Sequence, residues 1–253
     1  MSEFLIFAVI GFVAQIIDGA LGMGFGVISS SVLLGLGVPP ALASASVNAA
    51  KIPTTGTAAL SHLYHRNVDR STVLALCIFG TLGGIIGMAL LTSLKGGVLT
   101  ALITVYLFLI GGLILWRGIT GIAPSVIPAT RKRLIGLAGG LIEGIGGSWG
   151  PIVTTSLMGS GGESRYVIGS TNFAEFFVST AVFGAYIFAF WIGHWEGGTD
   201  WRSVAMPVAG LVIGGLPAAF FGGLLSKITP RKALTILVGL LAISIGIYRL
   251  VAA

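Results

Sequence analysis

The same unusual segment occurs twice in this chain, once in each half. Residues 11–22 align with residues 136–147, and the alignment places Asp18 over Glu143, each followed by a glycine. A carboxylate beside glycines inside apolar sequence is costly in a lipid bilayer, so it marks a functional site by default. The repetition therefore predicts two related halves that form a polar site at membrane depth.

A second pair of segments downstream aligns in the same way. Asn48 is matched by Asn172, and Lys51, three residues later, is matched by Glu175. Residues three apart share a helix face, so each half presents an amide beside a charged group. If the halves are related by inversion, equivalent positions meet near their interface. We therefore expect Lys51 and Glu175 to lie close together.

That pair has three interpretations. Lys51 attracts an anion while Glu175 tunes or exchanges its charge, or the two form a structural ion pair between helices. In the third, Lys51 extends its charged end toward a membrane interface.

The composition restricts the chain to a membrane protein. Of its 253 residues, 55% are hydrophobic and only 9% are charged, which is more apolar surface than a soluble core can bury. Apolar stretches near the roughly 20 residues of a membrane span recur along the sequence. The start of the chain lacks the cationic region and cleavage site of a signal peptide, so we expect the first apolar stretch to remain. Cys77 is the only cysteine, which excludes an internal disulfide.

The glycine-rich segments divide the chain into spans. Residues 4–36 and 134–158 each contain an acidic residue and a glycine cluster, which predicts two short helices joined by an unwound turn. The remaining apolar stretches predict full spans at 40–63, 72–93, 98–116, 166–191, 204–225 and 233–250.

Charge placement predicts how these segments are oriented. The net charge of +6 comes from basic residues in short loops, which is typical of cytoplasmic anchors and does not indicate a nucleic-acid partner. The loop at Arg66 to Arg70 is basic, whereas its counterpart at 193–201 carries Glu196 and Asp200. Equivalent loops therefore face opposite sides of the membrane. The three tryptophans near the second loop are typical of an aromatic belt: Trp191, Trp195 and Trp201.

Opposite-facing loops require an odd number of crossings per repeat, so each broken segment must be a re-entrant hairpin. We predict an all-α polytopic membrane protein forming one membrane domain, residues 1–253. Two inverted-topology repeats, 1–117 and 134–253, each contain a re-entrant broken-helix hairpin and three transmembrane spans. A cytoplasmic linker, 118–133, joins them, and both termini lie outside.

Several motifs resemble those of a known family. They are the glycine-rich run from Asp18 to Gly26, the segments 36–41 and 43–47, and the second-half segment 169–177. Together they are similar to the TauE/SafE family of sulfite and organosulfonate exporters, also called the toluene sulfonate uptake permease family. The resemblance covers nearly the whole chain. It implies a multi-pass secondary transporter, most simply an exporter, of small sulfur-containing or carboxylate anions in the inner (plasma) membrane.

The chain departs from the family's pattern at two positions. Relatives tend to carry His and Glu where this sequence has Asn48 and Lys51. That departure leaves the substrate open, and it also leaves open whether protons are the coupling ion.

The glycine-rich turns suit anion binding because glycine lets the backbone approach closely and half-helix amides point at the site. Close helix packing is the competing interpretation of these glycines. We expect the substrate to contact Gly22, Met23, Gly24, Asn48, Lys51, Gly147, Ser148, Trp149, Asn172 and Glu175. Asp18 and Glu143 either cap a half-helix or carry protons, and Gln15, one turn before Asp18, is a further polar lining residue.

Two other functions are open to this sequence. An anion channel is the nearer alternative within transport. The run from Gly146 to Gly150 also fits the G-x-S-x-G pattern of serine hydrolases, but Ser148 would need a neighbouring base. The histidines, His62, His65 and His194, are expected at span ends. We therefore expect no enzyme activity, cofactor or metal site; the expected partners are a small anion and the lipid bilayer, and the oligomeric state is open.

Overall fold

The described residues of this computed structural model fold into helices, which confirms the predicted all-α class. They are residues 2–36, 38–93, 108–109, 111–116, 118–120, 125–193 and 202–252. The helices are α1 (Ser2–Leu21), α2 (Phe25–Gly35), α3 (Pro40–Tyr64), α4 (Arg70–Ser93), α6 (Ala129–Gly146), α7 (Trp149–Gly159), α8 (Ser164–Trp191), α9 (Arg202–Ile228) and α10 (Arg231–Ala252).

Both broken segments are interrupted where the glycines predict. Gly22 and Gly24 have φ angles of 71° and 140°, and Gly147 has a φ of 65°. Residues with a β-carbon rarely adopt this left-handed region, so glycine is what allows the chain to reverse there. We call residues 22–24 the first turn and residues 147–148 the second turn.

The arms of the hairpins are unequal, which differs from the expectation of two short helices. α1 has 20 residues and α2 has 11. At about 1.5 Å per residue, α1 is about as long as the hydrocarbon core of a bilayer is thick. The apolar run continues to Leu21 without a breaker, so the helix continues with it. The second hairpin has the same asymmetry, with 18 residues in α6 and 11 in α7.

Four of the described helices are long and apolar enough to cross a membrane, within Phe4–Leu21, Arg70–Leu91, Ser164–Trp191 and Val204–Ile228. α3 has 25 residues, and serine, threonine, asparagine and lysine side chains lower its hydropathy. Most of the predicted span 98–116 lies outside the described residues, although residues 111–116 are helical. The predicted outer loop also lies largely outside them, including His194, Trp195, Glu196, Asp200 and Trp201.

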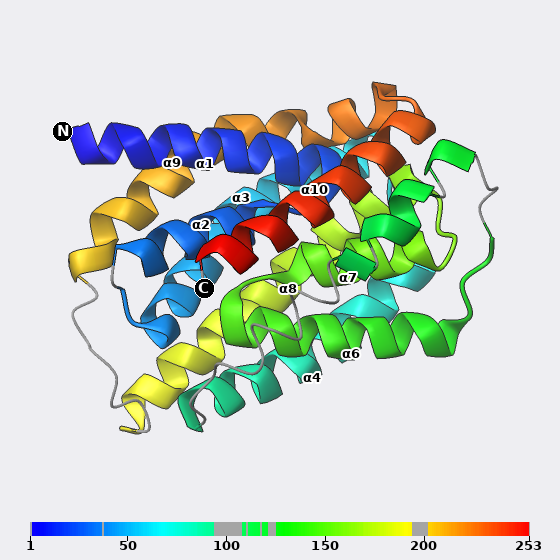
Figure 1. The fold of residues 1–253 in the computed structure, drawn as a ribbon. Coiled ribbons are helices and arrows are strands. Elements are labelled where there is room, and N and C mark those ends of the chain that lie inside the picture. The colour runs from blue at the N-terminus through cyan, green and yellow to red at the C-terminus, as the bar shows by residue number, and fades with distance from the viewer. Residues whose placement is uncertain are drawn as a thin grey trace.

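The two halves interlock through close backbone contacts. α1 packs along α9, and α6 packs along α4 (Figure 1). A methyl group on Gly19 would lie 2.8 Å from the Cα of Gly222, and one on Gly144 would lie 2.2 Å from the carbonyl oxygen of Gly84. Glycine at these positions lets the helices touch. Each long hairpin arm therefore packs against a helix from the other half.

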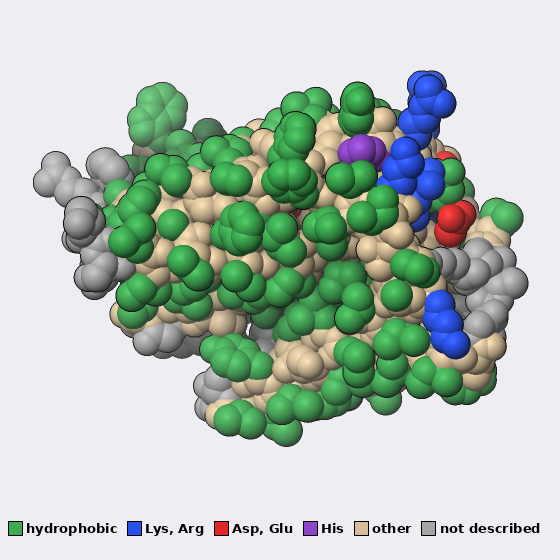
Figure 2. All heavy atoms as spheres, turned by 90° about the horizontal axis from the view of Figure 1, so that it is seen from above, with side chains coloured by type: hydrophobic (Ala, Val, Ile, Leu, Met, Phe, Trp, Pro, Cys, Tyr) green, Lys and Arg blue, Asp and Glu red, His purple; other side chains and the backbone are tan. Residues whose placement is uncertain are grey.

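One end of the molecule is basic, and its sides are apolar. Figure 2 shows Lys and Arg side chains gathered at the right end, while hydrophobic side chains cover much of the visible face. α1 begins at the opposite end (Figure 1). The described basic residues of the loops and adjoining helix ends are Arg66, Arg70, Arg131, Lys132, Arg133, Arg165, Lys227 and Lys232. An apolar exterior around buried polar groups is the arrangement expected in a lipid bilayer.

Candidate functional site

Lys51, on α3, is the centre of the buried polar cluster, with 1% of its surface exposed. Its Nζ lies 2.9 and 3.0 Å from the two carboxylate oxygens of Glu143 and 2.7 Å from the carbonyl oxygen of Gly147. It also lies 2.7 Å from Oε1 of Glu175. An ammonium group has three hydrogens to donate. All three are therefore directed at protein oxygens from α6, the second turn and α8.

Glu143 is held from several sides. Besides Lys51, it accepts hydrogen bonds from the backbone N–H of Trp149 at 2.7 Å and from the Ser179 hydroxyl at 3.1 Å. The Trp149 contact satisfies the first amide of α7, as an N-terminal cap does. Glu143 therefore joins Lys51, the second turn and α8.

Asp18 makes the equivalent contact in the first half. Its Oδ1 accepts a hydrogen bond from the N–H of Phe25, the first residue of α2, at 3.2 Å. Both acids of the repeated motif thus cap the short helix that follows their own turn. The amides of Gly22 and Gly147 are also used, since they donate to the carbonyl oxygens of Asp18 and Glu143.

Glu175 is less restrained than Glu143. Its Oε1 pairs with Lys51, but its Oε2 is buried and has no hydrogen-bond partner in the part of the chain that the structure describes. Lys51 and Glu175 lie together, as expected from the repeated motif. The contact between Lys51 and Glu143 was not predicted, because the alignment of the repeats pairs Glu143 with Asp18 and says nothing of its distance from α3.

The two hairpins cross beside Lys51. A methyl group on Gly26, in α2, would lie 1.7 Å from the carbonyl oxygen of Gly147 and 2.6 Å from Nζ of Lys51. The Thr154 hydroxyl on α7 donates to the carbonyl oxygen of Gly22. The beginnings of α2 and α7 therefore meet beside Lys51, the only cation among the described residues of this cluster.

The other predicted site residues lie around this crossing. Asn48 donates to the carbonyl oxygen of Ser44 at 2.9 Å, and its Nδ2 lies near the second turn. Asn172 donates to the backbone oxygen of Asp18 at 3.3 Å. Met23, Trp149 and Gln15 are fully buried. The Ser148 hydroxyl donates to the carbonyl oxygen of Gly146 at 3.3 Å.

Side chains that touch the site and were missed from the sequence include Ser179 and Tyr186 on α8. Ser179 bonds Glu143, and the Tyr186 hydroxyl donates to the carbonyl oxygen of Gly144 at 2.6 Å. Ser179 is four residues after Glu175 and so shares its helix face, a signal that could have identified it. Tyr186 is seven residues after Ser179 and so continues the same face of α8, which is the same kind of signal.

The contacts of the described histidines lie away from Ser148. Nε2 of His62 lies 3.0 Å from the carbonyl oxygen of Gly19, and its Nδ1 lies 3.3 Å from Asn67. His62 is in the last turn of α3, but it is fully buried. The described residues contain no group of three or more His, Cys, Asp or Glu side chains that could hold a metal ion.

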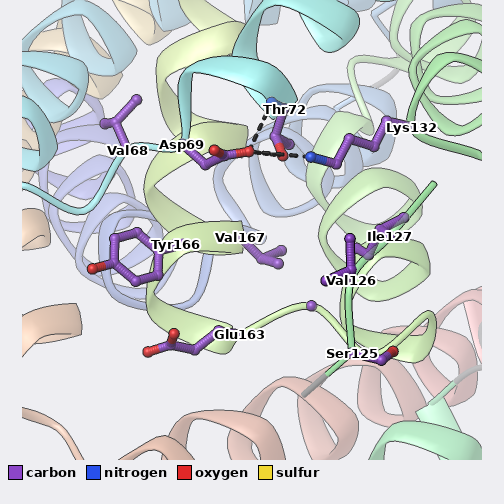
Figure 3. Close-up of a pocket in the computed structure, with 11 residues that line it drawn as sticks. Val68, Asp69, Thr72, Ser125, Val126, Ile127, Lys132, Glu163, Tyr166 and Val167 are labelled. Atoms are coloured by element: carbon purple, nitrogen blue, oxygen red, sulfur yellow. Dashed lines mark hydrogen bonds and ion pairs between the residues drawn. The ribbon is translucent and has the colours of Figure 1, made fainter. Parts of the chain in front are cut away.

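A surface pocket of about 310 Å³ lies at the basic end (Figure 3). Within it, Oδ2 of Asp69 accepts the N–H of Thr72 at 2.9 Å and pairs with Lys132 at 3.2 Å. Burial raises the pKa of Asp69, but the hydrogen bonds from Thr72 and the charge of Lys132 outweigh it and hold this pKa below its usual value. The pair connects the loop before α4 to the start of α6.

Comparisons with known proteins agree over nearly the whole chain. The profile of the family described as "Sulfite exporter TauE/SafE" matches residues 7–251. A protein of Bacillus subtilis (strain 168) described as "Probable membrane transporter protein YtnM" is 36% identical over 241 residues, covering 91% of this chain and 77% of that protein. No solved structure matches the chain.

Proposed function

Because this chain belongs to the TauE/SafE sulfite exporter family and is a membrane transporter, we propose that it carries a small anion such as sulfite, an organosulfonate or a related carboxylate. It does so in the inner (plasma) membrane, as a multi-pass protein working by alternating access. We propose no enzyme activity.

The observation that carries this proposal is the position of Lys51. It is a buried ammonium at the crossing of two short helices, α2 and α7, that begin in the interior of the protein. Helix beginnings carry partial positive charge, and transporters use such broken helices to hold anionic groups. When Glu175 moves away from the ammonium, the lysine and the two helix beginnings are the groups that attract an anion.

Glu175 is the group that we propose the anion displaces. The donors of Lys51 are all in use, so an anion reaches the ammonium only if one acceptor leaves. Glu143 has further bonds to Trp149 and Ser179, whereas Oε2 of Glu175 has no partner. Glu175 is therefore the acceptor that is least restrained.

The packing of the helices supports an inverted arrangement of the halves. α1 against α9 and α6 against α4 are equivalent pairs, each joining a long hairpin arm to a helix of the other half. The site lies between these pairs and is closed, with Lys51, Glu143 and Glu175 at most 1% exposed. We propose that movement of one pair relative to the other opens the site alternately to each side.

Counterflow in proteoliposomes tests this proposal. Vesicles loaded with unlabelled sulfite should accumulate labelled sulfite transiently, and thiosulfate, sulfoacetate and simple carboxylates should be compared as competitors. A carrier shows counterflow because its binding site releases one anion on one side of the membrane and returns with another anion bound. Rapid conduction without counterflow would indicate a channel, and no sulfite, sulfonate or carboxylate flux above empty vesicles would contradict anion transport.

A further inference from the structure

We propose that a small monovalent metal cation, for which Na⁺ is the probe, binds between α1 and α8 at oxygen atoms of Gln15, Asp18, Asn172 and Glu175. The role of this cation as a coupling ion rests on the proposed transport function. Its binding, however, is a property of the chain that can be measured without any transported anion.

The register of the two helices brings these four residues together. A methyl group on Gly22 would lie 3.3 Å from the Cα of Ile168, and the backbone oxygen of Asp18 lies 3.3 Å from Nδ2 of Asn172. Where they meet, α1 and α8 therefore run in opposite directions, so residues toward the start of α1 lie toward the end of α8. Gln15 lies one turn before Asp18 on α1, and Glu175 lies one turn after Asn172 on α8. Gln15 and Asp18 are three residues apart, as are Asn172 and Glu175, so each pair shares a helix face.

The side-chain oxygens of this group are buried and unpartnered. Among the described residues, Oε1 and Nε2 of Gln15, Oδ2 of Asp18, Oδ1 of Asn172 and Oε2 of Glu175 have no hydrogen-bond partner. All four side chains are at most 1% exposed. Buried polar atoms in native proteins are nearly always paired. Four residues that break this rule lie on α1 and α8, which meet where Asn172 donates to the backbone oxygen of Asp18. We take them to share one ligand.

The orientation of Asn172 shows which chemistry that ligand has. Its Nδ2 donates to the backbone oxygens of Asp18 and Ile168, the latter at 3.1 Å. This leaves Oδ1 as the free end, which can only accept a hydrogen bond or bind a cation. Two carboxylate and two amide oxygens form a ligand set typical of hard cations.

The local charge points the same way. Lys51 is one ammonium among the carboxyl groups of Asp18, Glu143 and Glu175, and it touches the latter two. One ammonium cannot balance three carboxylates. A cation beside Asp18 and Glu175 would compensate the negative charge that Lys51 does not neutralise. A proton would neutralise one carboxyl group and supply one donor, whereas a metal cation engages all four oxygens at once. The cation would also offset an anion bound at Lys51.

The experiment measures thermal unfolding of the purified protein at constant pH and ionic strength, with NaCl replacing choline chloride and no transported anion present. We expect the unfolding midpoint to rise saturably with Na⁺, because a ligand of the folded state stabilises it by mass action. KCl and choline chloride should give no comparable rise.

Variants locate the site. Asn172→Leu should raise the Na⁺ concentration required by about 10- to 100-fold or more, as losses around metal ligands commonly do. Thr180→Val, farther along α8, should respond as the wild type does. If Asn172→Leu does not fold, Gln15→Leu takes its place with the same expected loss.

Three results would overturn the cation site. They are stabilisation that follows pH but not Na⁺, equal stabilisation by Na⁺, K⁺ and choline, and an undiminished Na⁺ response in Asn172→Leu and Gln15→Leu. Failure of anion transport with an intact Na⁺ response would contradict only the proposed function.

Discussion

Glu143 and Glu175 both touch Lys51, yet their surroundings differ. Glu143 is also bonded by a helix amide and a hydroxyl, whereas one oxygen of Glu175 has no partner. A buried ion pair is weak evidence for stability, because desolvation offsets much of the attraction. What distinguishes the two acids is therefore how many groups would lose a partner if each were changed.

Glu143→Gln and Glu175→Gln should consequently differ in stability. We expect Glu143→Gln to lower the free energy of unfolding by about 3–5 kcal/mol, the range for breaking a buried pair. Glu175→Gln should cost less, because only its Lys51 contact changes. Denaturant or thermal unfolding of both variants in one detergent measures the difference. Equal losses would contradict the displaceable role of Glu175.

The contacts of Asp69 at the basic end predict that the stability of the protein falls at acidic pH. Its pKa is held below the usual value, so its stabilising contribution is fully present above the unfolded-state pKa of about 3.9. The contribution is lost as the pH falls through the lowered folded-state pKa. Because Asp69 is partly exposed, we expect less than about 1 kcal/mol.

Asp69→Asn should accordingly be less stable than the wild type at pH 6, and the difference should shrink below about pH 4. Thermal unfolding at pH 6 and pH 3 checks this. A difference that stays constant with pH would show that the carboxylate charge contributes nothing. Lys132→Met removes the cation of the pair and serves as the matched variant.

At the level of elements, the crossing of α2 and α7 depends on the absence of a side chain at Gly26. A methyl group there would overlap the carbonyl oxygen of Gly147 and approach Lys51. The turns would have to separate, and the acceptors of the ammonium would move with them. By contrast, a methyl group on Gly184, in α8, would meet no described atom within 4 Å.

We expect Gly26→Ala to abolish anion binding and Gly184→Ala to leave it unchanged. In a helix, Gly→Ala is by itself stabilising by roughly 0.5–1 kcal/mol, so a loss in Gly26→Ala reports the crossing and not helix propensity. Ligand-induced thermal shifts with sulfite on both variants decide the matter. Normal binding by a folded Gly26→Ala would exclude the crossing as the site.

The sequence predicts elements better than contacts between them. α3 was expected at 40–63 and spans Pro40–Tyr64, because apolar length and a proline at its first turn are local signals. The positions of both turns follow from their glycines in the same way. The prediction of two short helices underestimates α1, because the polar Asp18 does not end the helix, which continues to Leu21.

The candidate site is only partly a property of local sequence. Repetition identified the acids, amides and Lys51, and inversion suggested that Lys51 meets Glu175. The contact of Lys51 with Glu143 and the closeness of Gly26 depend on how two hairpins cross, which helix spacing does not specify. The same holds for the unpartnered oxygens between α1 and α8.

At the scale of the whole molecule, the inverted arrangement makes a prediction about sidedness. The loop near Asn67 should lie on the cytoplasmic side, because basic loops remain there, and the C-terminus should lie outside. Reporters of sidedness inserted at the two places should give opposite signals. Matching signals would contradict the inverted repeats and, with them, alternating access between equivalent halves.

The most direct test of anion binding at Lys51 is a calorimetric titration of the purified protein with sulfite, thiosulfate and sulfoacetate. The wild type should bind at least one of them. Lys51→Ala should lose that binding, because an anion in a low-dielectric site needs a positive partner, and Lys51→Arg should retain part of it. Unchanged binding by Lys51→Ala, together with easier unfolding, would show that Lys51 is only a structural ion pair and would contradict the anion site.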